Sequence, residues 1–252
     1  MVRARAAHRR VAQRRRSPLL IRSVPETRST NDDVAALARD GAPEGTWLRA
    51  GRQTGGRGRQ GREWLSPEGN LYASTLVRLQ MGDPPAHTLA LTAAVALHEI
   101  LSLYAAGAPL TIKWPNDILS DGAKVSGILL ERIGDCVVVG FGANLAEHPM
   151  ELERPTASIR ALAGAAPDPA SVVEALADSF ARWLGRWRSE GLKPVQSRWL
   201  AAAHPVGTVF TAAVSGEKVE GLFDGLDDNG ALRLRIADGT TRVINAGDVF
   251  LI

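Results

Sequence analysis

The sequence has a single cysteine, Cys136, among its 252 residues. One thiol excludes an intramolecular disulfide framework and a Cys-rich zinc site, and it fits a reducing compartment. No run approaches the roughly 20 unbroken apolar residues that a membrane-spanning helix requires. The N-terminus also lacks the apolar core of a secretory signal peptide. We therefore expect a cytoplasmic protein that builds its core without crosslinks and has no membrane partner.

Acidic residues are absent from residues 1–22, which carry eight arginines. Without those eight, 22 of the 30 Lys and Arg remain against 27 acids, a balance of about −5 for the rest of the chain. An Arg/Ala block without apolar periodicity predicts a disordered basic tail over residues 1–17. Such a tail is compatible with an arm attracted to nucleic acid or membrane, with a transit peptide, and with a dispensable extension, which is the favoured interpretation.

Apolar periodicity after the tail predicts a mixture of strands and helices. The expected strands are 19–21, 46–50, 71–79, 110–114, 124–132 and 135–140, and the expected helices are 32–39, 86–106, 170–189 and a shorter one through Trp199. Ser29-Thr30-Asn31 offers N-cap oxygens to the first helix. The two strands that flank Ile133-Gly134 are separated by a hairpin-sized link, so we expect them to be antiparallel.

The pattern changes after His204-Pro205, where five short β-type runs alternate with turn residues. These runs are 208–213, 217–223, 231–236, 241–244 and 248–251, and they predict a small β-barrel. The expected fold class is therefore α+β. It comprises a mixed sheet backed by helices over residues 18–204 and a C-terminal β module over 205–252.

The longest segment without apolar periodicity, Gly51 to Pro67, contains five glycines and four arginines. Loops of this length inside compact domains are usually functional or disordered. Gly56, Gly58 and Gly61 match the G-x-G-x-x-G spacing of dinucleotide-binding folds, which need a helix that opens at the third glycine. Gly61 instead leads toward Ser66-Pro67 and an expected strand. The sequence therefore argues against a dinucleotide site.

Glycine and guanidinium groups alternate along this loop. Glycines let backbone N–H groups approach an anion closely, and arginines supply planar donors that match phosphate or carboxylate oxygens. The combination favours a polyanionic small molecule over which the loop closes. Two other interpretations stay open from spacing alone. One is an RNA-contacting element in which Trp64 stacks on a base, and the other is a solvated charged loop.

Polar groups also stand at the ends of later strands. Lys113-Trp114-Pro115-Asn116-Asp117 places a cation, an indole, a carboxamide and a carboxylate at a strand end and turn. Lys124 enters an otherwise apolar strand, and Gly127 within that strand indicates room for a ligand or another backbone. Gly140 to Asn144 ends the next strand with two glycines and a carboxamide. Lys124 also suits an edge position and Asn144 a turn, but together these groups predict one pocket.

In this order the motifs resemble those of the biotin protein ligases that lack an N-terminal DNA-binding domain. The matching segments are Ser29-Thr30-Asn31, Gln53 with Gly56-Arg57-Gly58-Arg59-Gln60-Gly61-Arg62 and Trp64, Lys113 to Asp117, Lys124 with Gly127-Ile128-Leu129, and Gly140 to Asn144. Gly221 to Gly225 and Gly230-Ala231-Leu232 resemble the family's SH3-like C-terminal module. The resemblance covers nearly everything after residue 17 and implies a catalytic domain of the class II synthetase-like type.

The resemblance implies a two-step reaction. Biotin and MgATP give biotinyl-5′-AMP and pyrophosphate, and a lysine of a biotin carboxyl carrier protein domain then attacks the mixed anhydride. Joining two anions needs cations that offset their repulsion and hold the geometry. The family allows a homodimer. Specific DNA binding is not expected, because the 28 residues before Ser29 are too few for the helix-turn-helix domain of the family's repressors.

The resemblance also assigns site residues. Lys124 is placed where the biotin carboxylate and the α-phosphate meet, Arg57 and Arg59 are the other catalytic candidates, and the ureido end of biotin meets a polar corner. The expected biotin-binding residues are Ser29, Thr30, Asn31, Gln53, Gly56, Arg57, Gly58, Arg59, Trp64, Lys124, Gly127, Leu129 and Gly140. The expected ATP-binding residues are Arg59, Arg62, Lys113, Asn116, Lys124 and Asn144. Asp117 is a candidate Mg²⁺ ligand, with turn capping as the alternative.

Gln60 departs from the family pattern, because it stands where some relatives have arginine, which removes one charge from the loop.

Two other functions are alternatives to that of a biotin protein ligase. A lipoate or octanoate protein ligase or transferase of the same fold is an alternative, but the Gly/Arg loop does not match its signature. A non-enzymatic RNA-binding protein is a second alternative, and the net negative body argues against it because RNA binding needs a broad basic surface.

Overall fold

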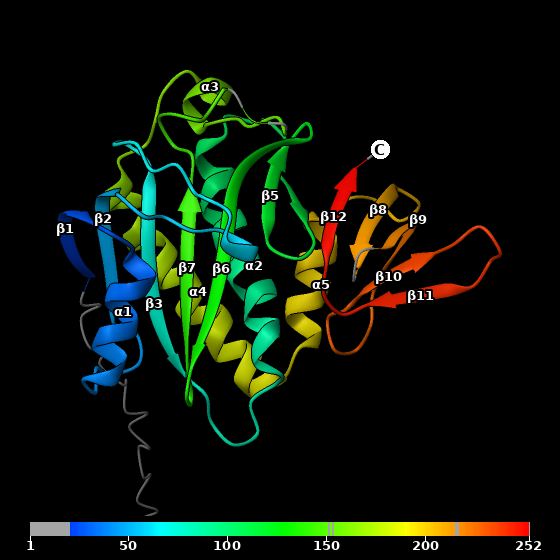
Figure 1. The fold of residues 1–252 in the computed structure, drawn as a ribbon, viewed down its shortest axis with the longest axis horizontal. Coiled ribbons are helices and arrows are strands. Elements are labelled where there is room, and N and C mark those ends of the chain that lie inside the picture. The colour runs from blue at the N-terminus through cyan, green and yellow to red at the C-terminus, as the bar shows by residue number, and fades with distance from the viewer. Residues whose placement is uncertain (1–20, 151, 153, 215–216, 252) are drawn as a thin grey trace, which may run out of the picture.

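The computed structural model describes residues 21–150, 152, 154–214 and 217–251. The tail expected to be disordered over 1–17, and the first two residues of the strand expected at 19–21, lie outside the described residues. The described chain forms a seven-stranded sheet with helices on both faces and a separate five-stranded sheet beside it (Figure 1).

The larger sheet has the strand order β1-β2-β3-β7-β6-β5-β4. Its strands are β1 (Ile21–Thr27), β2 (Trp47–Gln53), β3 (Leu71–Arg78), β4 (Thr111–Lys113), β5 (Asp117–Ser120), β6 (Ala123–Ile133) and β7 (Cys136–Ala143). β1 and β2 are parallel, and the other neighbours are antiparallel. This mixed sheet confirms the expected α+β class, and β6 and β7 form the predicted antiparallel hairpin.

Helix α1 (Thr30–Arg39) covers one face of this sheet. The side chain of Ser29 caps it by accepting a hydrogen bond from the backbone N–H of Asp32, so the helix begins where the sequence predicted an N-cap. Val34 and Ala38 on its inner side pack with Leu76, which points to this face from β3. The start of α1 lies next to Gln53 at the end of β2 and next to Gly140 of β7.

Three further helices cover the opposite face: α2 (Leu89–Tyr104), α4 (Pro169–Glu190) and α5 (Lys193–Ala202). Trp47 stacks on Phe141 at a centroid distance of 5.5 Å, and Phe180 of α4 packs edge-on against both rings. Residues 86–104 are long and apolar enough to pass a length-and-composition test for a membrane span. Because 67% of that segment is buried inside the molecule, it is the core helix of this layer.

The C-terminal module is a five-stranded antiparallel sheet with the order β11-β10-β9-β8-β12. Its strands are β8 (Val209–Val214), β9 (Glu217–Leu226), β10 (Leu232–Arg235), β11 (Thr241–Ile244) and β12 (Asp248–Leu251). Phe223 of this sheet packs against Trp199 of α5 and against Phe210. The expected boundary at residue 205 falls between α5 and β8, and the division into domains 18–204 and 205–252 stays a prediction.

The structure differs from the sequence-based expectation in three places. β2 extends to Gln53, so the irregular segment starts at Thr54 instead of Gly51. β5 follows Pro115-Asn116 directly, although a turn without a strand was expected there. The five-residue helix α3 (Ile159–Ala163) was not expected. β5 is stabilised by pairing with both β4 and β6, a tertiary effect that its four residues alone do not reveal.

Candidate active site

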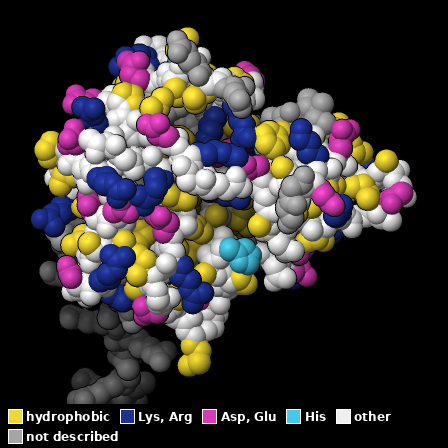
Figure 2. Space-filling view, in the orientation of Figure 1, with side chains coloured by type: hydrophobic (Ala, Val, Ile, Leu, Met, Phe, Trp, Pro, Cys, Tyr) yellow, Lys and Arg dark blue, Asp and Glu magenta, His cyan; other side chains and the backbone are white. Residues whose placement is uncertain are grey.

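A cavity of about 600 Å³ lies between the larger sheet, the loop after β2 and strand β12 of the C-terminal module. This volume is typical of a site for a small organic ligand. On the surface, basic side chains gather beside the hollow between the larger domain and the C-terminal module (Figure 2). The sequence placed its candidate residues in one pocket, and apart from Gly56 all of them line this cavity.

A corner of hydrogen-bonding side chains closes one end of the cavity. The Gln53 carboxamide oxygen accepts from the backbone N–H of Thr30 at 2.8 Å and from its hydroxyl at 3.1 Å. Ser74 of β3 lies beneath them, and its hydroxyl is 2.7 Å from the Thr30 hydroxyl and 2.6 Å from Asn31 Oδ1. Ser29, Thr30 and Asn31 are buried. These contacts fix the orientation of the groups that a polar ligand end would meet.

Three glycines of β6 and β7 make room for larger side chains in the cavity. A Cβ atom at Gly140 would overlap the Asn31 carboxamide oxygen, and one at Gly142 would lie 2.8 Å from the Trp64 indole. A Cβ atom at Gly127 would lie 3.2 Å from the same indole. The glycines therefore form a bare backbone floor, and Trp64 lies directly on it.

Three charged residues of β4, β5 and β6 form the basic end of the cavity. Lys124 Nζ lies 2.7 Å from Asp117 Oδ1, and Lys113 Nζ lies 3.5 Å from Asp117 Oδ2. Burial lowers the pKa of Lys113, and Asp117 only partly opposes this effect. Lys124 Nζ also lies 5.3 Å from the centre of the Trp64 ring, a cation–π distance. Two lysines share one carboxylate here, so the group keeps a positive charge for an anionic ligand.

The loop after β2 folds back on itself as a short ribbon. The backbone N–H of Trp64 donates to Gly56 O at 3.0 Å, and that of Gly58 donates to Arg62 O at 2.7 Å. Gly56 is not part of the cavity lining. A Cβ atom at this position would lie 2.6 Å from Trp64 O, so no side chain fits there. Glycine is therefore required at position 56 for the loop to pack. Gln60, at the tip, has φ 58°, the left-handed conformation of a tight turn.

Two of the loop arginines reach the C-terminal module. Arg59 donates to Gly247 O at 3.0 Å, and its guanidinium lies 3.6 Å from the Asp248 carboxylate. Arg62 forms a close ion pair with Asp248. Burial alone would raise the pKa of Asp248, but Arg62 and Arg59 hold it below its usual range. Strand β12 therefore completes the cavity, and Asp248 is a lining residue that the sequence analysis missed.

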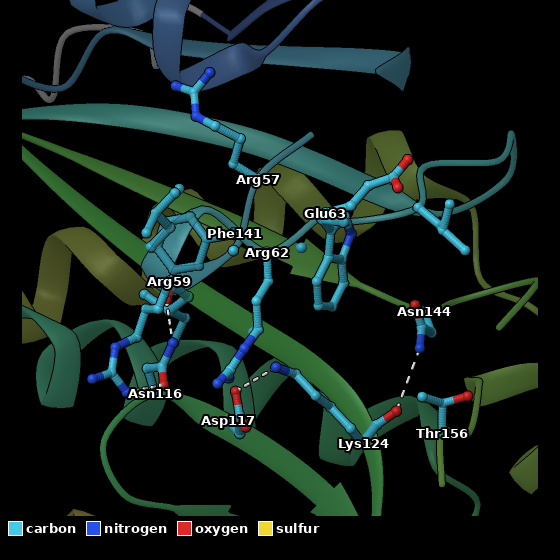
Figure 3. A pocket seen from close by; sticks show the side chains of 18 of the residues that line it. Arg57, Arg59, Arg62, Glu63, Asn116, Asp117, Lys124, Phe141, Asn144 and Thr156 are labelled. Carbon is cyan, nitrogen blue, oxygen red and sulfur yellow. Dashed lines mark hydrogen bonds and ion pairs between the residues drawn. The ribbon is translucent and has the colours of Figure 1, made fainter. Parts of the chain in front are cut away.

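Arg57 lies in a different environment from Arg59 and Arg62. Its guanidinium contacts the carboxylates of Asp32 and Glu131, and in the close-up view its side chain points away from Lys124 (Figure 3). The structure therefore separates Arg57 from the cations that converge on the middle of the cavity. Its expected role in catalysis stays a prediction.

The two carboxamides expected to bind ATP are held by backbone oxygens. Asn116 donates to Ile128 O at 2.6 Å, and Asn144 donates to Ala157 O at 3.1 Å. Arg59 lies 3.5 Å from Asn116 Oδ1. Asn144 also lies near Lys124 O, at 3.4 Å. Both carboxamides therefore fix the walls around Lys124, and their contact with a nucleotide stays a prediction.

A protein-held metal at Asp117 does not fit these contacts. Both oxygens of its carboxylate already face lysine ammonium groups, which compete with a cation for the same lone pairs. Across residues 21–150, 152, 154–214 and 217–251, no cluster of three His, Cys, Asp or Glu has the arrangement of a metal site. The donor set favours a charge-balancing role for Asp117 over that of a Mg²⁺ ligand.

The chain is similar to known protein families in both of its parts. Residues 24–144 match the biotin/lipoate A/B protein ligase family, and residues 211–252 match the biotin protein ligase C terminal domain. Over 235 residues the chain is 40% identical to a biotin–[acetyl-CoA-carboxylase] ligase of Paracoccus denitrificans, covering 89% of this chain and 97% of that protein. It is 34% identical to the bifunctional ligase/repressor BirA of Bacillus subtilis, covering 86% of this chain and 70% of BirA.

Solved structures resemble the whole described fold. The biotin protein ligase of Aquifex aeolicus in complex with biotin and ATP matches with a TM-score of 0.83 and 26% identity, over 92% of this chain and 99% of that one. The biotin protein ligase of Leishmania major in complex with biotinyl-5-AMP matches with a TM-score of 0.66 and 26% identity, over 91% and 100% of the two chains.

Proposed function

The chain belongs to the biotin protein ligase family, and we infer from its cavity how it activates biotin with ATP and transfers the biotinyl group to a lysine of a carrier protein. One observation carries this inference. The polar corner at Gln53, the glycine floor under Trp64 and the basic group around Lys124 line a single cavity. A ligand with a polar ring, an apolar body and a carboxylate fits that order of surfaces.

The polar corner receives the ureido ring of biotin. The ring presents N–H donors and a carbonyl acceptor, which need fixed partners when they leave water. Thr30 and Gln53 are already oriented by their mutual hydrogen bonds and by Ser74. The apolar part of biotin lies along the Trp64 indole and the bare backbone of Gly127. Preorganised partners of this kind lower the entropy cost of binding.

The first step joins the biotin carboxylate to the α-phosphorus of ATP. A carboxylate oxygen forms the new P–O bond, and the bond to the pyrophosphate oxygen breaks. Lys124 lies between the two anions, attracts both and stabilises the charge that develops on the phosphoryl oxygens. Arg59, Arg62 and Lys113 bind the phosphates from the loop and from β4. Mg²⁺ bound with ATP would offset the charge of the phosphates, and Asp117, which already faces two lysines, does not fit as its ligand.

In the second step the acceptor amine attacks the carbonyl carbon of biotinyl-5′-AMP. A C–N bond forms, the C–O bond to the phosphate breaks, and AMP leaves while the amine loses its proton. The nucleophile comes from a biotin carboxyl carrier protein domain of a biotin-dependent carboxylase. The loop ribbon closes over the adenylate and limits its escape before the acceptor arrives. A cytoplasmic location and the homodimer that the family allows stay predictions.

Pyrophosphate release by the purified full chain tests this function. With biotin, ATP and Mg²⁺ we expect pyrophosphate to form, and with an added biotin carrier domain we expect a stable biotinyl-lysine. Lipoate in place of biotin is the matched control, and it should give neither product. No pyrophosphate with biotin, or a preference for lipoate, would refute the proposal.

A further inference from the structure

Arg57 is bound by two carboxylates from distant parts of the fold. Its guanidinium donates to both oxygens of Asp32 on α1, at 3.0 and 2.5 Å, and to Glu131 Oε1 on β6 at 3.3 Å. The pairing with Asp32 is bidentate, the geometry in which guanidinium and carboxylate bind most strongly. About a third of each side chain is exposed, at 29% for Arg57, 37% for Asp32 and 36% for Glu131.

Glu131 also contacts the polar corner of the cavity. Its second oxygen, Oε2, accepts a hydrogen bond of 2.6 Å from Asn31 Nδ2, and Asn31 Oδ1 lies 2.6 Å from the Ser74 hydroxyl. One carboxylate therefore holds the loop arginine with one oxygen and a pocket carboxamide with the other. A change in either contact affects the other, because both share the position of the same side chain.

Anchoring Arg57 fixes more than one residue of the loop. Arg57 pairs with Glu63 as an isolated β-bridge, and the ribbon is closed on both sides of it by hydrogen bonds from Gly58 to Arg62 and from Trp64 to Gly56. Apart from Trp64, which packs on the glycines of β6 and β7, the ribbon from Gly56 to Trp64 carries no large apolar side chain, so polar contacts must fix the rest of it. The contacts of Arg57 thus help to fix the ribbon that carries Arg59 and Arg62, whose own side chains contact β12.

The charges in this cluster are balanced. Asp32 and Glu131 supply two negative charges, and Arg57 and Arg28 supply two positive ones, since Arg28 also pairs with Asp32 at 2.9 Å. The hydrogen bond from Arg57 holds the pKa of Asp32 below its usual value, and Asp32 in turn raises the pKa of Arg57. Both groups stay charged at neutral pH. The charge of Arg57 is therefore already compensated before any phosphate enters the cavity.

We propose that Asp32 and Glu131 are positioning residues that hold the loop in place through Arg57, and that Glu131 couples the loop to the biotin end of the cavity through Asn31. This inference deepens the proposed function and rests on it. It also gives Arg57 a different task from Arg59, because Arg57 binds the ribbon to α1 and β6, whereas Arg59 contacts β12 at the basic end of the cavity.

The test compares the wild-type chain with Asp32→Asn, Glu131→Gln and the double variant. The first measurement is tryptic cleavage within the loop, after Arg59 and Arg62, in the protein without ligands. Losing charge-assisted hydrogen bonds should accelerate this cleavage about tenfold in the double variant, while the melting temperature changes by less than about 2 °C. Asp33→Asn is the matched control, because it removes the same charge from the same turn of α1. It should leave cleavage unchanged.

The second measurement separates binding from chemistry. We expect Glu131→Gln to raise the KM for biotin about fivefold through Asn31, while kcat for pyrophosphate release stays within about threefold, since the charge it loses touches no reacting atom. The double variant should also release biotinyl-5′-AMP about tenfold faster. This release is measured as biotin labelling of a bystander protein. Cleavage and KM values equal to those of Asp33→Asn would overturn the proposal. So would a lower KM for ATP in Asp32→Asn, because that result would mean that the freed Arg57 binds phosphate.

The cleavage measurement tests the anchor independently of the proposed function. Loop cleavage is measured without biotin or ATP, so it reports on the anchor even if the wild type formed no pyrophosphate. A wild type that forms no pyrophosphate would refute the proposed function. The cleavage result would then still show whether Asp32 and Glu131 anchor the loop. An active wild type with unchanged cleavage in the double variant would refute the anchor alone.

Discussion

Lys124 Nζ lies 2.7 Å from Asp117 Oδ1, at the point where β6 and β5 pair. The second oxygen of the same carboxylate faces Lys113, whose Nζ also donates to Val249 O of β12 at 2.9 Å. One carboxylate on β5 thus orients two lysines toward the cavity from the strands on either side of it. This arrangement keeps both amines in place without a ligand and leaves a net positive charge for the anions that react there.

Lys124→Ala should abolish adenylate formation. The variant removes the cation between the two reacting anions, and we expect single-turnover pyrophosphate release to fall at least about 10³-fold. Biotin binding, followed by calorimetry, should weaken much less because the polar corner is untouched. Lys218→Ala, on the exposed end of β9, is the control and should be fully active. Adenylate formation by Lys124→Ala at the wild-type rate would contradict the assignment.

Asp117→Asn tests whether this residue orients lysines or holds a metal. If it orients Lys124, kcat should fall about tenfold while the Mg²⁺ concentration for half-maximal rate stays unchanged. The measurement is a Mg²⁺ titration of pyrophosphate release at saturating ATP. A large increase in the half-maximal Mg²⁺ concentration would instead support Asp117 as a metal ligand.

Arg59→Gly should weaken retention of the intermediate more than its formation. Arg59 connects the loop to Gly247 in the C-terminal module, and its loss removes a contact that keeps the ribbon closed. We expect biotinylation of bystander lysines, detected with streptavidin, to rise about tenfold. Gln60→Gly is the control in the same loop, since the left-handed backbone at Gln60 accepts glycine without strain. Equal leakage from the two variants would show that general flexibility, not the lost anchor, is responsible.

Most of the cations that line this cavity could be identified from the sequence because their pattern is local, whereas Arg154 could not. Alternating Gly and Arg in the loop, and the run from Lys113 to Asp117, each lie within a few residues of each other. The hairpin through Ile133-Gly134 was predictable for the same reason, since turn length limits the pairing of adjacent strands. The four-residue strand β5 was not, because its hydrogen bonds come from neighbours on both sides.

The acidic partners of those cations could not be located from the sequence. Asp248 and Glu131 sit at ordinary strand positions, and they meet their arginines across 186 and 74 residues of chain. A cation-rich loop with little apolar content does require counterions, so the existence of such acids was predictable. Which acids they are depends on how the sheet and the C-terminal module pack, and no local pattern encodes that choice.

Gly140→Ala should weaken biotin binding without unfolding the protein. The added Cβ atom would overlap the Asn31 carboxamide, so Asn31 must shift away from Glu131 and Ser74. We expect the Kd for biotin, measured by calorimetry, to rise at least about tenfold, since the corner loses its fixed geometry. Gly185→Ala in α4, where a Cβ meets open space, is the control and should stabilise the protein by up to about 1 kcal/mol. Unchanged biotin affinity in Gly140→Ala would show that Asn31 does not shape the pocket.

One buried and one half-buried histidine should make stability depend on pH below neutrality. Burial lowers the pKa of His98 below its ordinary 6.5, and burial together with Lys113 does the same for His204. Between the lowered pKa values and 6.5, the unfolded chain therefore binds more protons than the folded one. The free energy of unfolding should fall as the pH drops from 6.5 toward 5, by at most about 1.4 kcal/mol per pH unit for each histidine, and it should level off about one pH unit above 6.5.

Urea unfolding at pH 5, 5.5, 6, 6.5 and 7.5 measures this slope. His98→Gln keeps a donor for Leu110 O, which the imidazole Nε2 contacts at 2.9 Å, but it removes the titrating group. We expect its slope below pH 6.5 to be smaller than that of the wild type, and the slope of His98→Gln/His204→Gln to be smaller still. The carboxyl pKa values of Asp32, Glu44 and Asp248 are lowered from starting values of 3.8 to 4.5, so these acids titrate below this pH window. Equal slopes in all three proteins would show that the acid sensitivity arises elsewhere.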